Sequence, residues 1–179
     1  MAVFDLSGAV SSSMEKIKSL LIEELKQQGH RLTGALENSI QYQIKEDSTG
    51  ITAVMLGLDY GLIVEFGVAA DRIPYGGKSG SGGTSKYIQG LVRFFQLRGL
   101  VAREALSAAF ATAAVHKREG MPSRGSYAFS SNSRRTGFVK NTLEQYLPTL
   151  EQQIGKEAGL VVELTIGQDI KLEAYKIAA

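Results

Sequence analysis

Residue types that support catalysis or metal binding are few in this chain, and they are not grouped. The 179 residues include no cysteine and two histidines, which excludes disulfides, thiol nucleophiles and Cys-rich zinc sites. His30 stands beside Arg31, and His116 lies in a basic cluster; neither has a second histidine or a carboxylate at metal-ligand spacing. We therefore predict no metal site and no histidine-based catalysis.

The GKS triplet at 77–79 is a partial match to a phosphate-binding loop. The full pattern, G-x-x-x-x-G-K-[ST], needs a glycine where this chain has Arg72. The segment YGGKSGSGGTS (75–85) instead holds five glycines and three serines in eleven residues. Such a composition buries too little apolar surface to offset its ordering entropy, so we predict a flexible linker.

Other patterns for nucleophilic or acid–base catalysis are weak. Glu23, Glu24 and Glu37 could supply a carboxylate pair, but acids on an amphipathic helix usually form its solvent-exposed face. No G-x-S-x-G elbow occurs, and the serines concentrate in loops. We expect no enzyme activity, no catalytic residue and no cofactor.

The elements that would position these groups begin with a helix predicted over 12–28. Ser12 with Glu15 fits a capping box at its start, and Gly29 is the expected stop. Its apolar residues recur at helical spacing: Met14, Ile17, Leu21 and Leu25.

Two strands joined by a turn at 47–50 are predicted next. The stretch NSIQYQIKED alternates, with Ile40, Tyr42 and Ile44 on one face and polar residues on the other. ITAVMLGL (51–58) is apolar on both faces, so it should lie deeper in the sheet than its partner.

Helical patterns dominate the segment 86–119, as two helices or as one helix kinked at Gly99, and they end at Gly120 and Pro122. Residues 121–135 are polar and turn-rich, which predicts a second exposed loop.

A further helix is predicted over about 136–155, with a kink or break at Pro148. GLVVELTIGQDIKLEAY near the C-terminus predicts a strand, and a hairpin around Gly167.

These elements predict an α+β fold. It comprises an N-terminal amphipathic helix, a small mixed or antiparallel sheet with a hairpin, a long helical region and a C-terminal strand. The length indicates a single domain over 1–179, with mobile loops at about 71–86 and 121–135.

Charge is distributed unevenly along the chain despite a net charge of +2. Residues 1–70 carry five Lys/Arg and nine Asp/Glu, a net charge of −4; residues 71–140 carry twelve and three, a net charge of +9. Residues 141–179 carry three and six, a net charge of −3. Three interpretations stay open: a nucleic-acid-facing surface, an electrostatic match between copies of the chain, or a solvated face without a function.

The run DYGLIVEFG (59–67) carries an acid, Glu65, close to the glycine that ends it. Four features occur in order along this part of the chain: an amphipathic helix, a TG-x-L-x-x-SI element, a hairpin and a Y-x-x-x-VE[FY]G element. This order resembles the neck or tail-completion proteins of long-tailed bacteriophages over roughly residues 10–70. The matching residues are Thr33, Gly34, Leu36, Ser39, Ile40, Tyr60, Val64, Glu65, Phe66 and Gly67.

The chain departs from that family after Gly67. Compact members continue with a short proline-rich, arginine-containing segment and a final helix. This chain inserts the Gly/Ser segment, a long helical region and an extra C-terminal strand region. HKREGMPSRGSYAFSS (116–131) is the counterpart we assign to the proline-rich segment.

The resemblance implies a structural virion protein, made in the bacterial cytoplasm and located at the neck. Copies would form a closed ring, about sixfold or about twelvefold, through head-to-tail contacts. Its expected partners are portal, adaptor or stopper proteins on the head side and the tail-tube protein on the other, with weak contact to genomic DNA and no membrane. It would complete or terminate the tail. The alternative is a DNA-binding module that uses residues 71–140.

The resemblance and the charge pattern together suggest seven interface residues. Glu65 would meet an arginine of the adjacent subunit, or else it faces water or caps a local turn. Under the first reading, Glu65→Arg should weaken ring assembly and leave the monomer folded. The seven residues are Tyr60, Val64, Glu65, Phe66, Arg124, Arg134 and Arg135.

Overall fold

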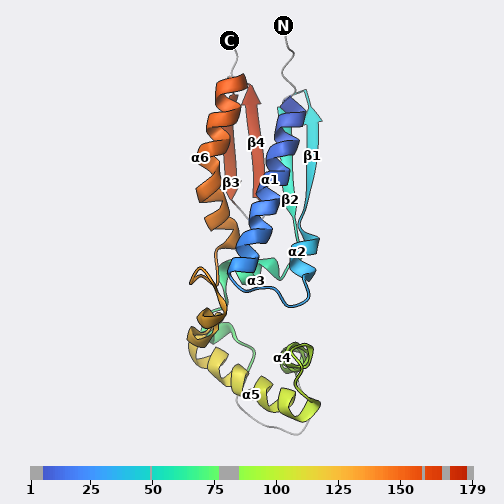
Figure 1. Ribbon diagram of the computed structural model, residues 1–179, viewed down its shortest axis with the longest axis vertical. Helices are drawn as coiled ribbons and strands as arrows, with labels where there is room; N and C mark the ends of the chain where they lie inside the picture. Colours follow the sequence, from blue (N-terminus) through green and yellow to red (C-terminus); the bar gives the residue numbers. More distant parts are fainter. Residues whose placement is uncertain (1–5, 49, 77–84, 159, 167–169, 177–179) are drawn as a thin grey trace.

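The protein has an α+β fold, as the sequence predicts, in which one sheet and two long helices form one end and a helical pair forms the other (Figure 1). The computed structural model describes residues 6–48, 50–76, 85–158, 160–166 and 170–176. Its four-stranded antiparallel sheet has the order β1-β2-β4-β3. Both long helices, α1 (Leu6–Gln27) and α6 (Phe138–Ala158), lie on the same face of that sheet (Figure 1).

Helix α1 spans Leu6–Gln27, so it begins before the predicted start at Ser12. The capping-box prediction is wrong, because Ser12 lies within the helix and its side chain is exposed. The apolar stripe extends back to Val10, which is buried in the core and continues the helix.

Gly29 ends α1 as predicted. It has a φ of +71°, a left-handed conformation that favours glycine. The backbone N–H of Gly29 donates to Lys26 O at 2.9 Å, and that of His30 donates to Leu25 O at 3.0 Å. These two bonds form a Schellman motif, which turns the chain out of the helix.

The predicted N-terminal hairpin is confirmed as β1, Gln41–Asp47, and β2, Gly50–Leu56. Tyr42 and Ile44 are half-buried while the polar residues between them are exposed, which matches the alternation in the sequence. Strand β2 lies between β1 and β4, so its apolar character on both faces reflects an inner position. A short helix, α2, at Ala35–Ser39 precedes β1 and was not predicted.

The C-terminal hairpin is also confirmed, as β3, Leu160–Ile166, and β4, Ile170–Lys176. Strand β4 pairs with β2, with Ala53 opposite Leu172. The first and last hairpins of the chain therefore belong to one sheet.

Helix α6 spans Phe138–Ala158 and lies beside α1 (Figure 1). It continues through Pro148 without the break that proline suggested. The main core fills the space between the two helices and the sheet. Its buried members are Val10, Met14, Ile17, Leu21, Leu25, Leu36, Ile40, Ile51, Ala53, Phe138, Val139, Leu143 and Leu150.

The run that contains Glu65 forms a short helix, α3, at Gly61–Phe66, which is followed by a 3₁₀ turn, η1, at Ala70–Arg72. Most of the predicted Gly/Ser linker, residues 77–84, lies outside the described residues. The chain then enters α4, whose N-terminal Ser85 accepts a hydrogen bond from Ile88 N.

The helical region contains two separate helices, which decides between the two predicted arrangements. Helix α4 spans Lys86–Leu97 and α5 spans Ala102–Glu119. Gly99, with a φ of +93°, donates to Gln96 O, and Leu100 N donates to Phe95 O. This second Schellman motif ends α4 and lets α5 fold back against it.

Residues 121–135, predicted as an exposed loop, contain a 3₁₀ helix, η2, at Arg124–Phe129. Met121 exchanges two backbone hydrogen bonds with Val68, and Ser131 N donates to Gln27 O at 2.8 Å. This segment is thus bonded to α1 and to the chain after α3, contacts that the sequence did not indicate.

Candidate functional site

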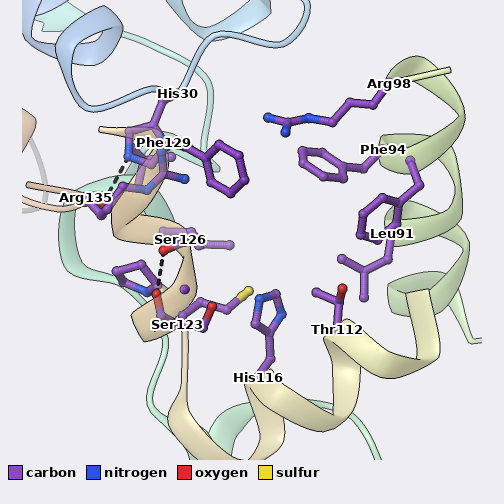
Figure 2. Close-up of a pocket in the computed structure, with 16 residues that line it drawn as sticks. His30, Leu91, Phe94, Arg98, Thr112, His116, Ser123, Ser126, Phe129 and Arg135 are labelled. Carbon is purple, nitrogen blue, oxygen red and sulfur yellow. Dashed lines mark hydrogen bonds between the residues drawn. The ribbon is translucent and has the colours of Figure 1, made fainter. Parts of the chain in front are cut away.

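A cavity of about 410 Å³ opens between α4, α5 and residues 121–135. We call it the α4–α5 cavity. Figure 2 shows side chains from α4 on one side, side chains from η2 and the end of α1 on the other, and α5 below. Its size is within the range of small-molecule sites.

Apolar side chains form most of the cavity wall. Leu91, Phe94 and Phe95 come from α4, and Phe129 faces them from the end of η2 (Figure 2). The α4 side chains are placed by close helix packing. Alanines on α5, including Ala109 and Ala113, are fully buried against α4, and such small residues let the two helices approach each other.

Arg98 lies at the edge of this wall and bridges its two sides. Its guanidinium carbon is 4.6 Å from the ring centroid of Phe94 and 5.4 Å from that of Phe129. Both distances are within the range for cation–π attraction. One cation therefore links α4 to the segment that faces it.

Arg135 supplies a second guanidinium at the opposite wall. One of its terminal nitrogens donates to the carbonyl of Gln28, while its buried Nε has no hydrogen-bond partner. Burial lowers the pKa of Arg135, and the charge of Arg98 lowers it further. The two arginines therefore repel each other across the cavity.

Two histidines also belong to the polar part of the wall. His30 Nε2 is 3.0 Å from the carbonyl of Arg135, and His116 Nδ1 is 2.7 Å from the hydroxyl of Tyr87. Burial and the charge of Arg135 lower the pKa of His30, partly offset by that carbonyl. Burial lowers the pKa of His116, partly offset by Glu119. Both rings are therefore favoured as neutral groups in the folded chain.

This preference predicts a loss of stability in weak acid. Because both folded pKa values lie below the ordinary value of 6.5, protonation favours the unfolded chain. The neutral rings make their full contribution to the free energy of unfolding above about pH 6.5. This contribution is lost as the pH falls through that value toward the folded pKa. Urea unfolding at about pH 7.5 and about pH 5.5 measures the loss. Between these two pH values, the double variant His30→Gln/His116→Gln should lose less free energy of unfolding than the natural chain. Equal losses would show that the two histidines are not the cause.

The formally charged side chains in the described lining of the cavity are all positive. None of its described lining residues is Asp or Glu, although two are arginines. The described part of the chain also holds no cluster of three or more potential metal-ligating side chains. None of the described helices combines the length and the apolar composition that crossing a membrane requires.

Among the predicted interface residues, Glu65 is engaged within the chain. Its carboxylate accepts hydrogen bonds from the backbone N–H groups of Val139, at 2.8 Å, and Lys140, at 3.1 Å. These are unpaired donors of the first turn of α6. Glu65 therefore caps a helix that begins far along the sequence, a role distinct from the local turn and the intersubunit pair considered above.

The three predicted arginines also differ in their surroundings. Arg134 lies 3.9 Å from Glu24, and Arg135 lines the cavity. Arg124 is exposed, and its backbone N–H donates to Glu119. The structure brings none of the three into a single cluster with Glu65.

The other predicted residues lie on or beside α3. Val64 is half-buried and lines the cavity, while Tyr60 and Phe66 are exposed. Sequence reasoning did not identify Phe94, Arg98 or Phe129 as site residues. The helical spacing of α4 was visible, but nothing in the sequence shows that η2 would face it.

Comparisons with protein families, with curated proteins and with solved structures found no match for this chain.

Proposed function

We propose that this chain is a structural subunit of the neck of a long-tailed bacteriophage, in which a ring of copies joins the head to the tail and completes the tail. The proposal starts from the two sequence elements that resemble that family. Its further support comes from how these elements pack and from which of their side chains are exposed.

The two elements contact each other in the folded chain. Ser39 Oγ donates to Leu36 O at 2.8 Å and accepts a hydrogen bond from Leu58 N at 3.2 Å. Leu36 is buried, and its Cδ1 would lie 3.3 Å from a Cβ at Gly61. The residues of the resemblance thus form one corner of the fold, which fits a shared structural signature better than two unrelated short matches.

An exposed apolar surface on α3 is the observation that carries the proposal. We call it the α3 patch: Leu62, Ile63 and Phe66, which are 51%, 48% and 70% exposed. Residues three and four apart share one face of a helix, so these side chains are neighbours. Clustered apolar exposure is costly in water and marks surfaces that bind other proteins.

Charge segregation gives a second line of support. The net +9 of residues 71–140 belongs to the part that contains α4, α5 and η2, whereas residues 1–70, with α1, β1 and β2, carry −4. Figure 1 places α4 and α5 at the end remote from the sheet. Opposite charges at different ends of one subunit favour the head-to-tail contacts that a closed ring needs.

Phe66→Ser is expected to shift ring assembly to about tenfold or higher protein concentration, because buried aromatic anchors dominate interface energies. Size-exclusion chromatography with light scattering over a concentration series measures the shift. Val101→Ser is the matched control, since Val101 is 63% exposed and lies at the start of α5, outside the patch. A monomeric natural chain at every concentration, or equal shifts in both variants, would count against the proposal.

A DNA-binding module is the second candidate, favoured by exposed arginines such as Arg93, Arg103 and Arg124. Arg134 and Arg135, however, make contacts within the chain. The same samples discriminate between the two candidates: a monomer that shifts a duplex DNA probe, with strong salt dependence, favours the module.

A further inference from the structure

We propose that the α4–α5 cavity is a binding site for a small amphipathic carboxylate, a compound with an aromatic or branched apolar body and one carboxyl group. This inference concerns a ligand of the single chain, although Ile63 of the α3 patch also lines the cavity.

The apolar part of such a ligand matches the cavity wall. Leu91, Phe94 and Phe95 line the cavity from α4, and Met121 and Phe129 add apolar groups from the segment that faces it. The volume of about 410 Å³ accommodates a two-ring aromatic compound. Three phenylalanines provide ring faces and edges for an aromatic body.

The anionic part matches the two arginines. Arg98 and Arg135 come from opposite sides of the cavity, and no carboxylate is among the described residues that line it. An anion between the guanidiniums would offset their mutual repulsion.

A carboxylate suits this site better than a phosphate. The wall is mostly apolar, and the transfer of an ion out of water becomes more costly as its charge increases. The two histidines add no permanent positive charge, because their pKa values are lowered and one nitrogen of each already has a polar partner. A singly charged carboxylate, with two acceptor oxygens, is the better match for two guanidiniums.

Arg98 is accessible to a ligand at the edge of the cavity. The residue is exposed, and it is held by two aromatic rings rather than by an ion pair with a described acid. A carboxylate can bind the guanidinium edge while its faces stay on the rings. The side chain would then anchor the carboxylate at the edge of the cavity.

Titration with 2-naphthoate, followed by amide chemical shifts and calorimetry, tests the site. The natural chain should bind 2-naphthoate about tenfold or more tightly than neutral 2-naphthalenemethanol, because only the former engages the arginines. Arg98→Gln should lower the affinity for 2-naphthoate about tenfold relative to the affinity for the neutral compound. Arg93→Gln is the matched control: Arg93 is exposed on the same helix and does not line the cavity.

A second variant tests the apolar half of the site. Thr112→Trp should fill the cavity from α5 and weaken both naphthalene compounds, with circular dichroism to establish that the chain stays folded. Equal affinity for the two compounds, or the same effect of Arg98→Gln and Arg93→Gln, would overturn the proposal. An acidic aromatic peptide that binds about a hundredfold more tightly than 2-naphthoate would overturn the ligand class and assign the cavity to a protein partner.

Discussion

Glu24→Ala is expected to lower the free energy of unfolding by about 3 kcal/mol, because three side-chain amides lose the charged acceptor that they share. Glu24 is 9% exposed. Its Oε1 accepts hydrogen bonds from Gln28 Nε2 at 2.9 Å and Asn132 Nδ2 at 3.1 Å, with Asn141 Nδ2 at 3.4 Å. One carboxylate thus joins α1, the segment before α6, and α6 itself.

The same variant should loosen residues 121–135 and widen the α4–α5 cavity. Asn132 lies in that segment and has Glu24 as the acceptor of its side-chain N–H. Phe129 and Arg135, which line the cavity, lie within three residues of Asn132. We therefore expect faster tryptic cleavage at Arg124 and Arg134, two exposed cleavage sites of this segment.

Glu23→Ala is the matched control for that measurement. Glu23 is the neighbouring acid on α1, is exposed, and accepts one hydrogen bond from Gln27 at 3.3 Å. Its replacement should cost no more than about 0.5 kcal/mol in urea unfolding. Similar losses for the two variants would show that the buried network contributes little.

Local patterns in the sequence accounted for most of the secondary structure. The alternation around Tyr42 and Ile44 predicts β1, and the apolar stripe through Leu21 predicts α1, because these residues face a single layer of the core. The short helices α2 and α3 were not predicted. Five residues in α2 and six in α3 are too few to display a helical period, and their contacts, such as Leu36 with Gly61, hold them in place.

The candidate site could not be predicted in the same way, because its contacts join distant parts of the chain. Phe94 and Phe129 both contact Arg98, although they belong to different helices separated by all of α5. Arg134 lacks an acid nearby in sequence, and Glu24 approaches it from α1. A pattern read along the chain reports which face of a helix is apolar, but it does not report what packs there.

Glu65 shows most directly how such a contact alters a functional hypothesis. From the sequence, Glu65→Arg was expected to weaken ring assembly without affecting the monomer. In the fold, Glu65 accepts two backbone N–H groups at the start of α6, and its own backbone carbonyl accepts a hydrogen bond from Gly137 N at 2.8 Å. The carboxylate also lies at the positive end of the helix dipole. The substitution Glu65→Arg should therefore first affect the stability of the monomer.

Glu65→Arg is expected to lower the free energy of unfolding by about 2 to 3 kcal/mol. The variant loses a helix cap, worth about 1 kcal/mol, and places a positive charge against the N-terminus of α6. Glu65→Gln should cost about 1 kcal/mol, because it keeps one carbonyl acceptor while it removes the charge. Urea unfolding at low protein concentration measures both values without a contribution from assembly.

The control is Glu46→Arg, the same change of charge at an exposed position near the tip of the β1–β2 hairpin. It should stay within about 0.5 kcal/mol of the natural chain, since no helix end is involved. Amide exchange separates the two roles of Glu65. Faster exchange at Val139 and Lys140 in Glu65→Arg would locate the damage at the start of α6. A fully stable Glu65→Arg monomer that fails to form rings would instead restore the intersubunit role.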